Sequence, residues 1–443
     1  MIMWYNLPMA KIKLTKQKKA WVVAVNMGYG HQRTAYPLKN FAAEDRIINA
    51  NNYEGIPTAD KKLWESTRIF YELISNFKRF PVLGDIAFEF FIDKFQKISI
   101  FYPKKDLSKP TFQLKKVEGM IGSGWGRDLI ERLKKNPLPI ISTFFTSAFM
   151  AEHFKYPGEI YCVVCDADVS RAWVRADPKK SRIKYLVPND WVIERLKLYG
   201  VEEKNIFLTG YPLPLENIGG QKLNILKKDF SHRLLNLDPE GHYYKQYRTL
   251  IKKYVGNLPR TKSHILTIMF SIGGAGAQKD IAVKLVKSLA EKIKKEEVKI
   301  ILMAGVKYKV RQFFFSKLKS LKLAGYIGKN IEVVFSDGVE EYFKKFNQKL
   351  RETDILWTKP SELSFYTALG IPIIIAPPVG SQEDFNKRWL LRLGAGIAQE
   401  NADYADQWIF DYLKSGRFAE AAMQGFIEAE KLGTYNIKKI CLG

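Results

Sequence analysis

The chain has 443 residues and a formal net charge of +25, from 71 Lys and Arg against 46 Asp and Glu. An apolar fraction of 46% with 13% aromatic residues excludes a disordered chain, and the length predicts two or three domains. Three cysteines exclude a disulfide framework and favour a reducing cytoplasm. The longest apolar stretches fall far short of the roughly 18 residues that a membrane-spanning helix needs.

The first half of the chain alternates short buried strands with helices. Residues 21–26 predict a strand, which is followed by a glycine turn and a helix. The aromatic, amphipathic stretch 61–102 predicts helices. Further strands are expected at 139–145, 159–165, 182–187 and 205–209, with a helix at 190–199. This alternation is typical of a mostly parallel sheet that is covered on both faces.

The same pattern restarts in the second half, after a basic helical stretch. Strands are expected at 264–271, 298–304, 331–335, 355–357 and 371–376, with a helix at 280–294. We therefore predict four parts: an N-terminal Rossmann-like domain over 18–216, a basic linker or insertion over 217–262, a C-terminal domain over 263–405, and C-terminal helices over 406–443 that return to the N-terminal domain.

The positive charge is concentrated in two stretches. Residues 1–20 carry five lysines and no acidic residue, and residues 221–262 carry ten Lys and Arg against three acidic residues. A basic surface attracts nucleic acid, an anionic membrane face or phosphate-bearing substrates, although a solvated lysine-rich surface is the plainer explanation. Because no zinc-finger spacing or RNA-binding consensus is present, we expect no nucleic-acid partner.

The first candidate site is the turn Gly28-Tyr29-Gly30-His31, directly after the first strand. Its glycines let backbone N–H groups approach a ligand, and the helix N-terminus that follows favours an anion. A histidine at the carboxyl end of a strand lies where open α/β sheets bind ligands, and neutral imidazole can take a proton from a hydroxyl. A helix-capping histidine without chemistry explains the same residues equally well.

The second candidate site is the glycine-rich turn that contains Gly273, Gly274 and Gly276 and ends with Gln278. A glycine loop alone is often only a tight turn. Here a strand precedes it and a helix follows, so its N–H groups can hold a diphosphate. The loop lacks the Lys-Ser/Thr ending of a P-loop, which disfavours an ATPase.

The third candidate site follows the last strands of the second half. It comprises Lys359, Ser361 and Glu362, and further along Gln382, Glu383 and Asn386. Glu362 opens a helix after a strand, where a carboxylate can accept two ribose hydroxyls, and the later polar residues can bond sugar hydroxyls. An acid that merely satisfies the helix dipole is the alternative, and the ordered set downstream disfavours it.

Two aspartates, Asp166 and Asp168, end the third expected strand. They can hold a substrate hydroxyl, orient His31 or cap the next segment, and the spacing does not choose among these roles. Cys162 and Cys165 form a C-x-x-C inside the same strand pattern. Zinc needs four ligands, so we expect two buried core cysteines rather than a metal site.

Together these motifs resemble those of inverting glycosyltransferases of family 28, typified by monogalactosyldiacylglycerol synthase, processive diacylglycerol glucosyltransferases and the lipid II N-acetylglucosaminyltransferase. Three stretches carry the resemblance: 26–31, 162–212, and 359–396 with its Gly370-Ile371-Pro372 segment. Lys359-Pro360-Ser361 replaces the usual glycine-containing segment before the glutamate, and 217–262 has no counterpart in the family.

The resemblance implies an α/β, GT-B architecture: two Rossmann-like domains that face each other across a cleft. It implies a UDP-linked sugar held mainly by the C-terminal domain, through Gly273, Gly274, Gly276, Gln278, Lys359, Ser361, Glu362, Gln382, Glu383 and Asn386. His31 is then the catalytic base and Asp166 a second catalytic residue, with Gly28, Gly30 and Asp168 on the acceptor side. No metal or other cofactor is required.

The basic excess and the aromatic stretch 61–102 predict a lipid acceptor at an anionic membrane, for a cytoplasmic protein bound peripherally to the cytoplasmic face. Core packing explains the aromatic residues nearly as well, which leaves a soluble acceptor open. Two other functions fit the same motifs: a UDP-sugar 2-epimerase, which uses the same fold without an acceptor, and a non-catalytic nucleotide-sugar or polyanion binder.

Overall fold

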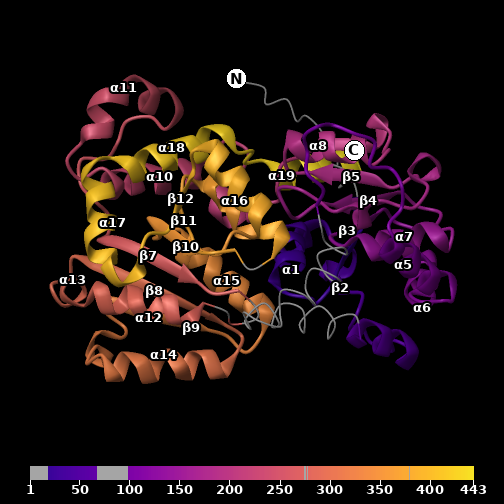
Figure 1. Ribbon diagram of the computed structural model, residues 1–443, viewed down its shortest axis with the longest axis horizontal. Helices are drawn as coiled ribbons and strands as arrows, with labels where there is room; N and C mark the ends of the chain where they lie inside the picture. Colours follow the sequence, from indigo (N-terminus) through magenta and orange to yellow (C-terminus); the bar gives the residue numbers. More distant parts are fainter. Residues whose placement is uncertain (1–17, 67–97, 274–275, 277, 379) are drawn as a thin grey trace, which may run out of the picture.

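The computed structural model describes residues 18–66, 98–273, 276, 278–378 and 380–443. Gly274, the lysines at 11, 13 and 16, and most of the aromatic stretch 61–102 lie outside the described residues. Within them, the chain forms two six-stranded sheets in which all the paired strands are parallel (Figure 1).

The N-terminal sheet has the strand order β2-β1-β3-β4-β5-β6. Its strands are β1 (Trp21–Ala24), β2 (Ile48–Asn49), β3 (Ile140–Ser142), β4 (Ile160–Val163), β5 (Lys184–Val187) and β6 (Ile206–Leu208). The central strands are apolar runs buried along their whole length, which is the pattern expected of a parallel sheet covered on both faces. The connecting helices include α1 (Tyr29–Ala35), α5 (Phe112–Gly122), α6 (Arg127–Lys134), α7 (Phe145–His153) and α8 (Asp190–Leu198).

The C-terminal sheet has the order β12-β11-β10-β7-β8-β9. Its strands are β7 (Leu266–Ser271), β8 (Val298–Gly305), β9 (Ile331–Phe335), β10 (Ile355–Thr358), β11 (Ile373–Ile375) and β12 (Gly396–Ala398). The helices between them are α12 (Lys279–Ser288), α13 (Ala290–Lys294), α14 (Tyr308–Ser320), α15 (Val339–Leu350) and α16 (Ser381–Leu393). In place of the expected α-helix after β10, the chain forms a 3-10 helix, η7 (Glu362–Leu369).

Each sheet has one point where the strand order reverses: between β1 and β3 in the first sheet, and between β7 and β10 in the second. Open α/β sheets bind ligands outside the carboxyl ends of the strands at such a point. His31 follows β1, and Gly273 and Lys359 follow β7 and β10. The topology therefore puts the predicted motifs at both reversal points.

The basic stretch 217–262 is helical and packed on the C-terminal half. It includes α10 (Asn224–Leu237) and α11 (His242–Tyr254), and both contact α18 (Arg417–Glu428). Buried Arg233 on α10 donates to the carbonyl oxygens of Thr353 at 2.6 Å and Leu369 at 2.8 Å. These bonds attach the stretch firmly to one domain, so it is not a free connection between two.

The C-terminal helices divide between the two halves. Helices α17 (Ala405–Lys414) and α18 stay on the C-terminal half, whereas α19 (Gly433–Leu442) lies against the N-terminal sheet (Figure 1). The apolar side of α19, with Ile437 and Cys441, joins a core cluster with Val22 and Val163 on one face of that sheet. The chain thus returns to the N-terminal half once, near residue 430. Of the helices predicted to return, α19 does so, whereas α17 and α18 remain on the C-terminal half.

Candidate active site

His31 lies in the first turn of α1 and is held by the loop after β3. Its Nδ1 is 2.8 Å from the carbonyl oxygen of Thr143, and the Thr143 hydroxyl donates to the His31 carbonyl oxygen at 2.9 Å. A carbonyl oxygen can only accept, so Nδ1 carries the proton in this bond. The neutral ring therefore presents the lone pair of Nε2, which is the atom that can take a proton.

Aromatic rings surround the His31 side chain. Its ring centroid is 4.7 Å from that of Phe144 and 6.2 Å from that of Trp173. Burial lowers the pKa of His31 to about 4, against the raising effects of the Thr143 carbonyl and the nearby Glu362. The imidazole is therefore neutral near pH 7.

Asp166 lies just beyond β4 and is linked to His31 through a thiol. The Cys165 sulfur is 3.4 Å from His31 Nδ1 and 3.8 Å from Asp166 Oδ2. Burial, together with the nearby carboxylates of Glu362 and Glu383, raises the pKa of Asp166 to about 6, against the lowering effect of the hydrogen bond from the Asn386 amide. As predicted, Cys162 and Cys165 are buried; the contact of Cys165 with His31 was not predicted.

Asn386 joins the two domains. Its Nδ2 donates to Asp166 Oδ1 at 2.9 Å, and its Oδ1 accepts from the Ala167 N–H at 2.7 Å. The side chain comes from α16 of the C-terminal half and is fully buried. Asn386 was predicted to contact the donor, but here both ends of its amide are bonded to the loop that carries Asp166.

Glu362 also faces the N-terminal domain, across a buried ion pair. Arg33 on α1 donates from Nε to Glu362 Oε1 at 3.2 Å, and the two side chains are only 3% and 10% exposed. The Arg33 guanidinium lies 4.5 Å and 4.2 Å from the ring centroids of Phe343 and Phe346 on α15. An added Cβ at Gly30 would lie 3.4 Å from Glu362 Oε2, an ordinary contact that shows how closely Glu362 approaches α1. Gly28, at the N-cap of α1, needs glycine for its φ of 106°.

The remaining donor-side residues lie along the glycine turn and the start of α16. Lys359 pairs with Glu383 and lies over Gly273, where an added Cβ would come to 2.6 Å from Lys359 Cε. Gln278 donates to the carbonyl oxygen of Pro377 at 2.6 Å. Ser361 directly precedes η7, and Gln382 lies in the first turn of α16. These contacts gather most of the predicted donor set at the β7–β10 reversal point.

Asp168 does not belong to this group of side chains, because it forms a separate buried ion pair with Arg195. Arg195 donates from Nε and Nη2 to its two carboxylate oxygens at 2.9 and 2.8 Å, and both side chains are at most 1% exposed. Trp191 Nε1 and the Val169 N–H occupy the remaining acceptor positions, each at 2.8 Å. Its oxygens are fully bonded and buried, so in this structure Asp168 anchors α8, whereas the prediction placed it on the acceptor side.

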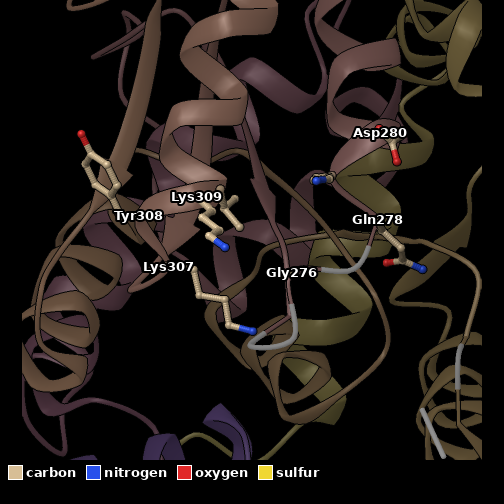
Figure 2. A pocket seen from close by; sticks show the side chains of 8 residues that line it. Gly276, Gln278, Asp280, Lys307, Tyr308 and Lys309 are labelled. Carbon is tan, nitrogen blue, oxygen red and sulfur yellow. The ribbon is translucent and has the colours of Figure 1, made fainter. Parts of the chain in front are cut away.

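A cavity of about 720 Å³ opens beside the glycine turn (Figure 2). Its lining residues come from the starts of α12 and α14: Gly276, Gln278, Lys279, Asp280, Lys307, Tyr308, Lys309 and Val310. Tyr29, two residues before His31, accepts a hydrogen bond from the Val306 N–H at 3.0 Å, next to this lining. The first turn of α1, which carries His31, and the wall of the cavity are therefore joined directly.

Two negative findings apply to the described residues alone. Across these ranges, no group of three or more His, Cys, Asp or Glu side chains is arranged to hold a metal ion. None of the helices within them is both long and apolar enough to span a bilayer.

Comparison with known proteins gives relatives over most of the chain. The profile of a domain of unknown function, DUF6938, matches residues 257–349. A processive diacylglycerol beta-glucosyltransferase of Bacillus subtilis (strain 168) is 23% identical over 362 residues, which are 79% of this chain and 82% of the relative. The Bacillus pumilus (strain SAFR-032) enzyme of the same name is 22% identical over 397 residues, 87% of this chain and 84% of the relative.

Among solved structures, MurG of Acinetobacter baumannii has a TM-score of 0.43 at 11% identity, over 74% of this chain and 78% of that one. A putative UDP-N-acetylglucosamine 2-epimerase of Listeria monocytogenes has 0.41 at 11% identity, over 76% and 80%. The two six-stranded parallel sheets themselves confirm the expected pair of Rossmann-like domains. The resemblance that the motifs indicate is likewise confirmed: the chain is a distant relative of the diacylglycerol glucosyltransferases.

Proposed function

We propose that this protein is an inverting glycosyltransferase that moves a sugar from a UDP-sugar to a hydroxyl of a lipid acceptor. The observation that carries the proposal is the orientation of the His31 ring. Its Nδ1 donates a hydrogen bond to the Thr143 carbonyl oxygen, so Nε2 is the atom that can act as a base at the junction of the domains. The similarity to diacylglycerol glucosyltransferases supports this chemistry and this class of acceptor.

The reaction is a single displacement at the anomeric carbon. The acceptor oxygen forms the new bond to that carbon while the bond to the diphosphate oxygen breaks, and the acceptor proton passes to His31 Nε2. The imidazolium that forms is stabilised by the negative charge of Glu362 and of Asp166, the latter linked to His31 through Cys165. A neutral resting histidine is available for this step throughout the physiological pH range.

The donor lies on the C-terminal side of the junction. We place its diphosphate at the glycine turn after β7, where the start of α12 offers backbone N–H groups, and its ribose and sugar near Glu362 and the start of α16. The departing diphosphate gains negative charge that the helix dipole and nearby cations can stabilise, so the proposed reaction needs no metal ion.

The acceptor hypothesis places the protein peripherally on the cytoplasmic face of a membrane. The net charge of +25 supports it, because each Lys or Arg near an anionic surface contributes about 1 kcal/mol to binding. Flotation with phosphatidylglycerol-containing vesicles at low salt tests this part. We expect the protein in the floated fraction; recovery only in the pellet argues for a soluble acceptor.

A donor screen followed by product analysis tests the activity. UDP- and GDP-sugars are first ranked by the rise they cause in the unfolding temperature, because a ligand that binds only the folded state stabilises it. The best donor is then incubated with diacylglycerol vesicles and with no acceptor, and the products are identified by mass spectrometry. A glycosylated lipid supports the proposal. An isomerised donor in the acceptor-free reaction identifies an epimerase, and binding without turnover a non-catalytic protein.

A further inference from the structure

The cavity beside the glycine turn is bordered by the N-termini of two helices. Lys279 begins α12, while Lys307 is the N-cap residue of α14 and Lys309 lies in its first turn. The N-terminal end of a helix carries partial positive charge, so cations there are unfavourable and acids are preferred. The first turn of α14 contains no acidic residue, and no side chain caps it. The start of α14 therefore lacks the residue types that stabilise a helix N-terminus. Such departures from local sequence preference are common where a ligand binds.

Within the described part of the chain, no acidic side chain pairs with the two lysines of the α14 turn, Lys307 and Lys309. The side chains of Lys307 and Lys309 form no ion pair or hydrogen bond with the described residues, and both are exposed. Their side chains point toward Gly276 in Figure 2, whereas the carboxylate of Asp280 lies on the opposite side of the view. Lys279, the third lysine of the lining, lies 4.2 Å from the ring centroid of Phe313.

The turn that carries Lys307 and Lys309 is hydrogen-bonded to the helix that carries His31, the proposed base. The Val306 N–H, one residue before Lys307, donates to the Tyr29 hydroxyl, and Tyr29 packs at 5.3 Å from the ring of Tyr342. Gly305 has a φ of 73°, and a Cβ there would come to 2.6 Å from the Tyr29 hydroxyl. The α14 turn is therefore fixed against the first turn of α1, which carries His31, on the edge of the junction between the domains.

We propose that Lys307 and Lys309 bind the diphosphate of the nucleotide donor, together with the helix ends that border the cavity. The inference rests on the proposed function and assigns to the donor site two residues that no sequence motif indicates. A diphosphate supplies what the cavity lacks: negative charge for the lysines and acceptors for the uncapped N–H groups of α14. A volume of about 720 Å³ is in the usual range for a small-molecule site.

The phosphates of an anionic membrane offer the same chemistry. The concave shape of the site, the two helix ends and the link through Tyr29 to the first turn of α1 favour the nucleotide, because a membrane surface needs no enclosed space. Vesicles of phosphatidylglycerol are therefore one arm of the test.

The experiment compares the full-length protein with the Lys307→Met, Lys309→Met double variant by calorimetric titration of UDP, UMP and uridine. The control is Lys319→Met, Lys329→Met, which removes the same charge from exposed lysines of the same domain outside the cavity. We expect the cavity variant to lose UDP affinity about tenfold or more, UMP affinity less, and uridine affinity not at all. The control keeps the affinities of the unchanged protein.

The outcomes separate this inference from the function on which it rests. If the unchanged protein binds UDP and the cavity variant binds it equally well, the lysine assignment is wrong while the proposed function stands. If the cavity variant keeps UDP binding but loses vesicle binding, the lysines serve a membrane and the inference is overturned. If the unchanged protein binds no UDP, the UDP-donor assignment fails, and the lysine assignment fails with it.

Discussion

Replacing Asp166 with Asn is expected to stabilise the fold while it impairs transfer. In the folded protein, burial and the nearby carboxylates raise the pKa of Asp166 from its ordinary 3.8 to about 6. At neutral pH the folded state must therefore hold an ionised carboxyl in a place that disfavours the charge. Asn keeps an oxygen that can accept from Asn386 and removes this charge.

The size of the effect follows from the shift. A difference of roughly two pH units corresponds to about 3 kcal/mol of unfolding free energy, at about 1.4 kcal/mol per unit, as an upper bound. Because the folded pKa is the higher one, the wild-type protein loses this stability as pH rises from about 4 to about 6. The advantage of the variant is thus full at pH 7.5 and falls to about 1 kcal/mol at pH 4.5.

Thermal unfolding at several pH values measures this difference. We expect an unfolding temperature higher by roughly 2–6 °C at pH 7.5, and a difference about one third as large at pH 4.5. Asp411→Asn, on an exposed face of α17, is the matched control and should show no such trend. A variant less stable than wild type at pH 7.5, or a gain independent of pH, would refute the reasoning about the Asp166 environment.

Three further outcomes are expected. His31→Ala should abolish transfer while UDP still binds in a calorimetric titration; turnover in this variant removes His31 from its role. Arg33→Met should lower the unfolding free energy by about 3–5 kcal/mol in a denaturant titration, because it leaves the buried carboxylate of Glu362 unpaired, and an unchanged midpoint would contradict the importance of that pair. Gly305→Ala should reduce transfer by disturbing the Tyr29 contact, which a crystal structure of the variant would show; full activity with Tyr29 displaced argues against the coupling.

Most strands of both sheets follow from the sequence, including the edge strands β6 and β9, but the edge strands β2 and β12 do not. Strands such as β1, β7 and β8 are mostly apolar and almost entirely buried, as expected for a sheet covered on both faces. The two-residue β2 and the three-residue β12 lie at the edges, and neither is fully buried. They carry too little periodicity to be recognised, because their conformation depends on pairing with a neighbouring strand.

The candidate site is predictable where a motif fixes its place on one sheet. His31 and Asp166 both follow strands of the N-terminal sheet, so their meeting follows from the topology alone. The roles of Arg33 and Asn386 depend on how the two domains pack, which no local pattern encodes. No motif marks Lys307 and Lys309; they become conspicuous only once the structure places them at the uncapped N-terminus of α14, where the helix dipole disfavours cations.

The most direct test of the central claim is the anomeric configuration of the transferred sugar. UDP-glucose, an α-linked donor, is incubated with diacylglycerol vesicles, and the glycolipid product is examined by proton NMR, with His31→Ala as the blank. Direct attack by the acceptor, with His31 as base, gives a β-linked glycolipid that the variant does not form. An α-linked product, or a β-linked product formed equally by His31→Ala, would contradict the mechanism.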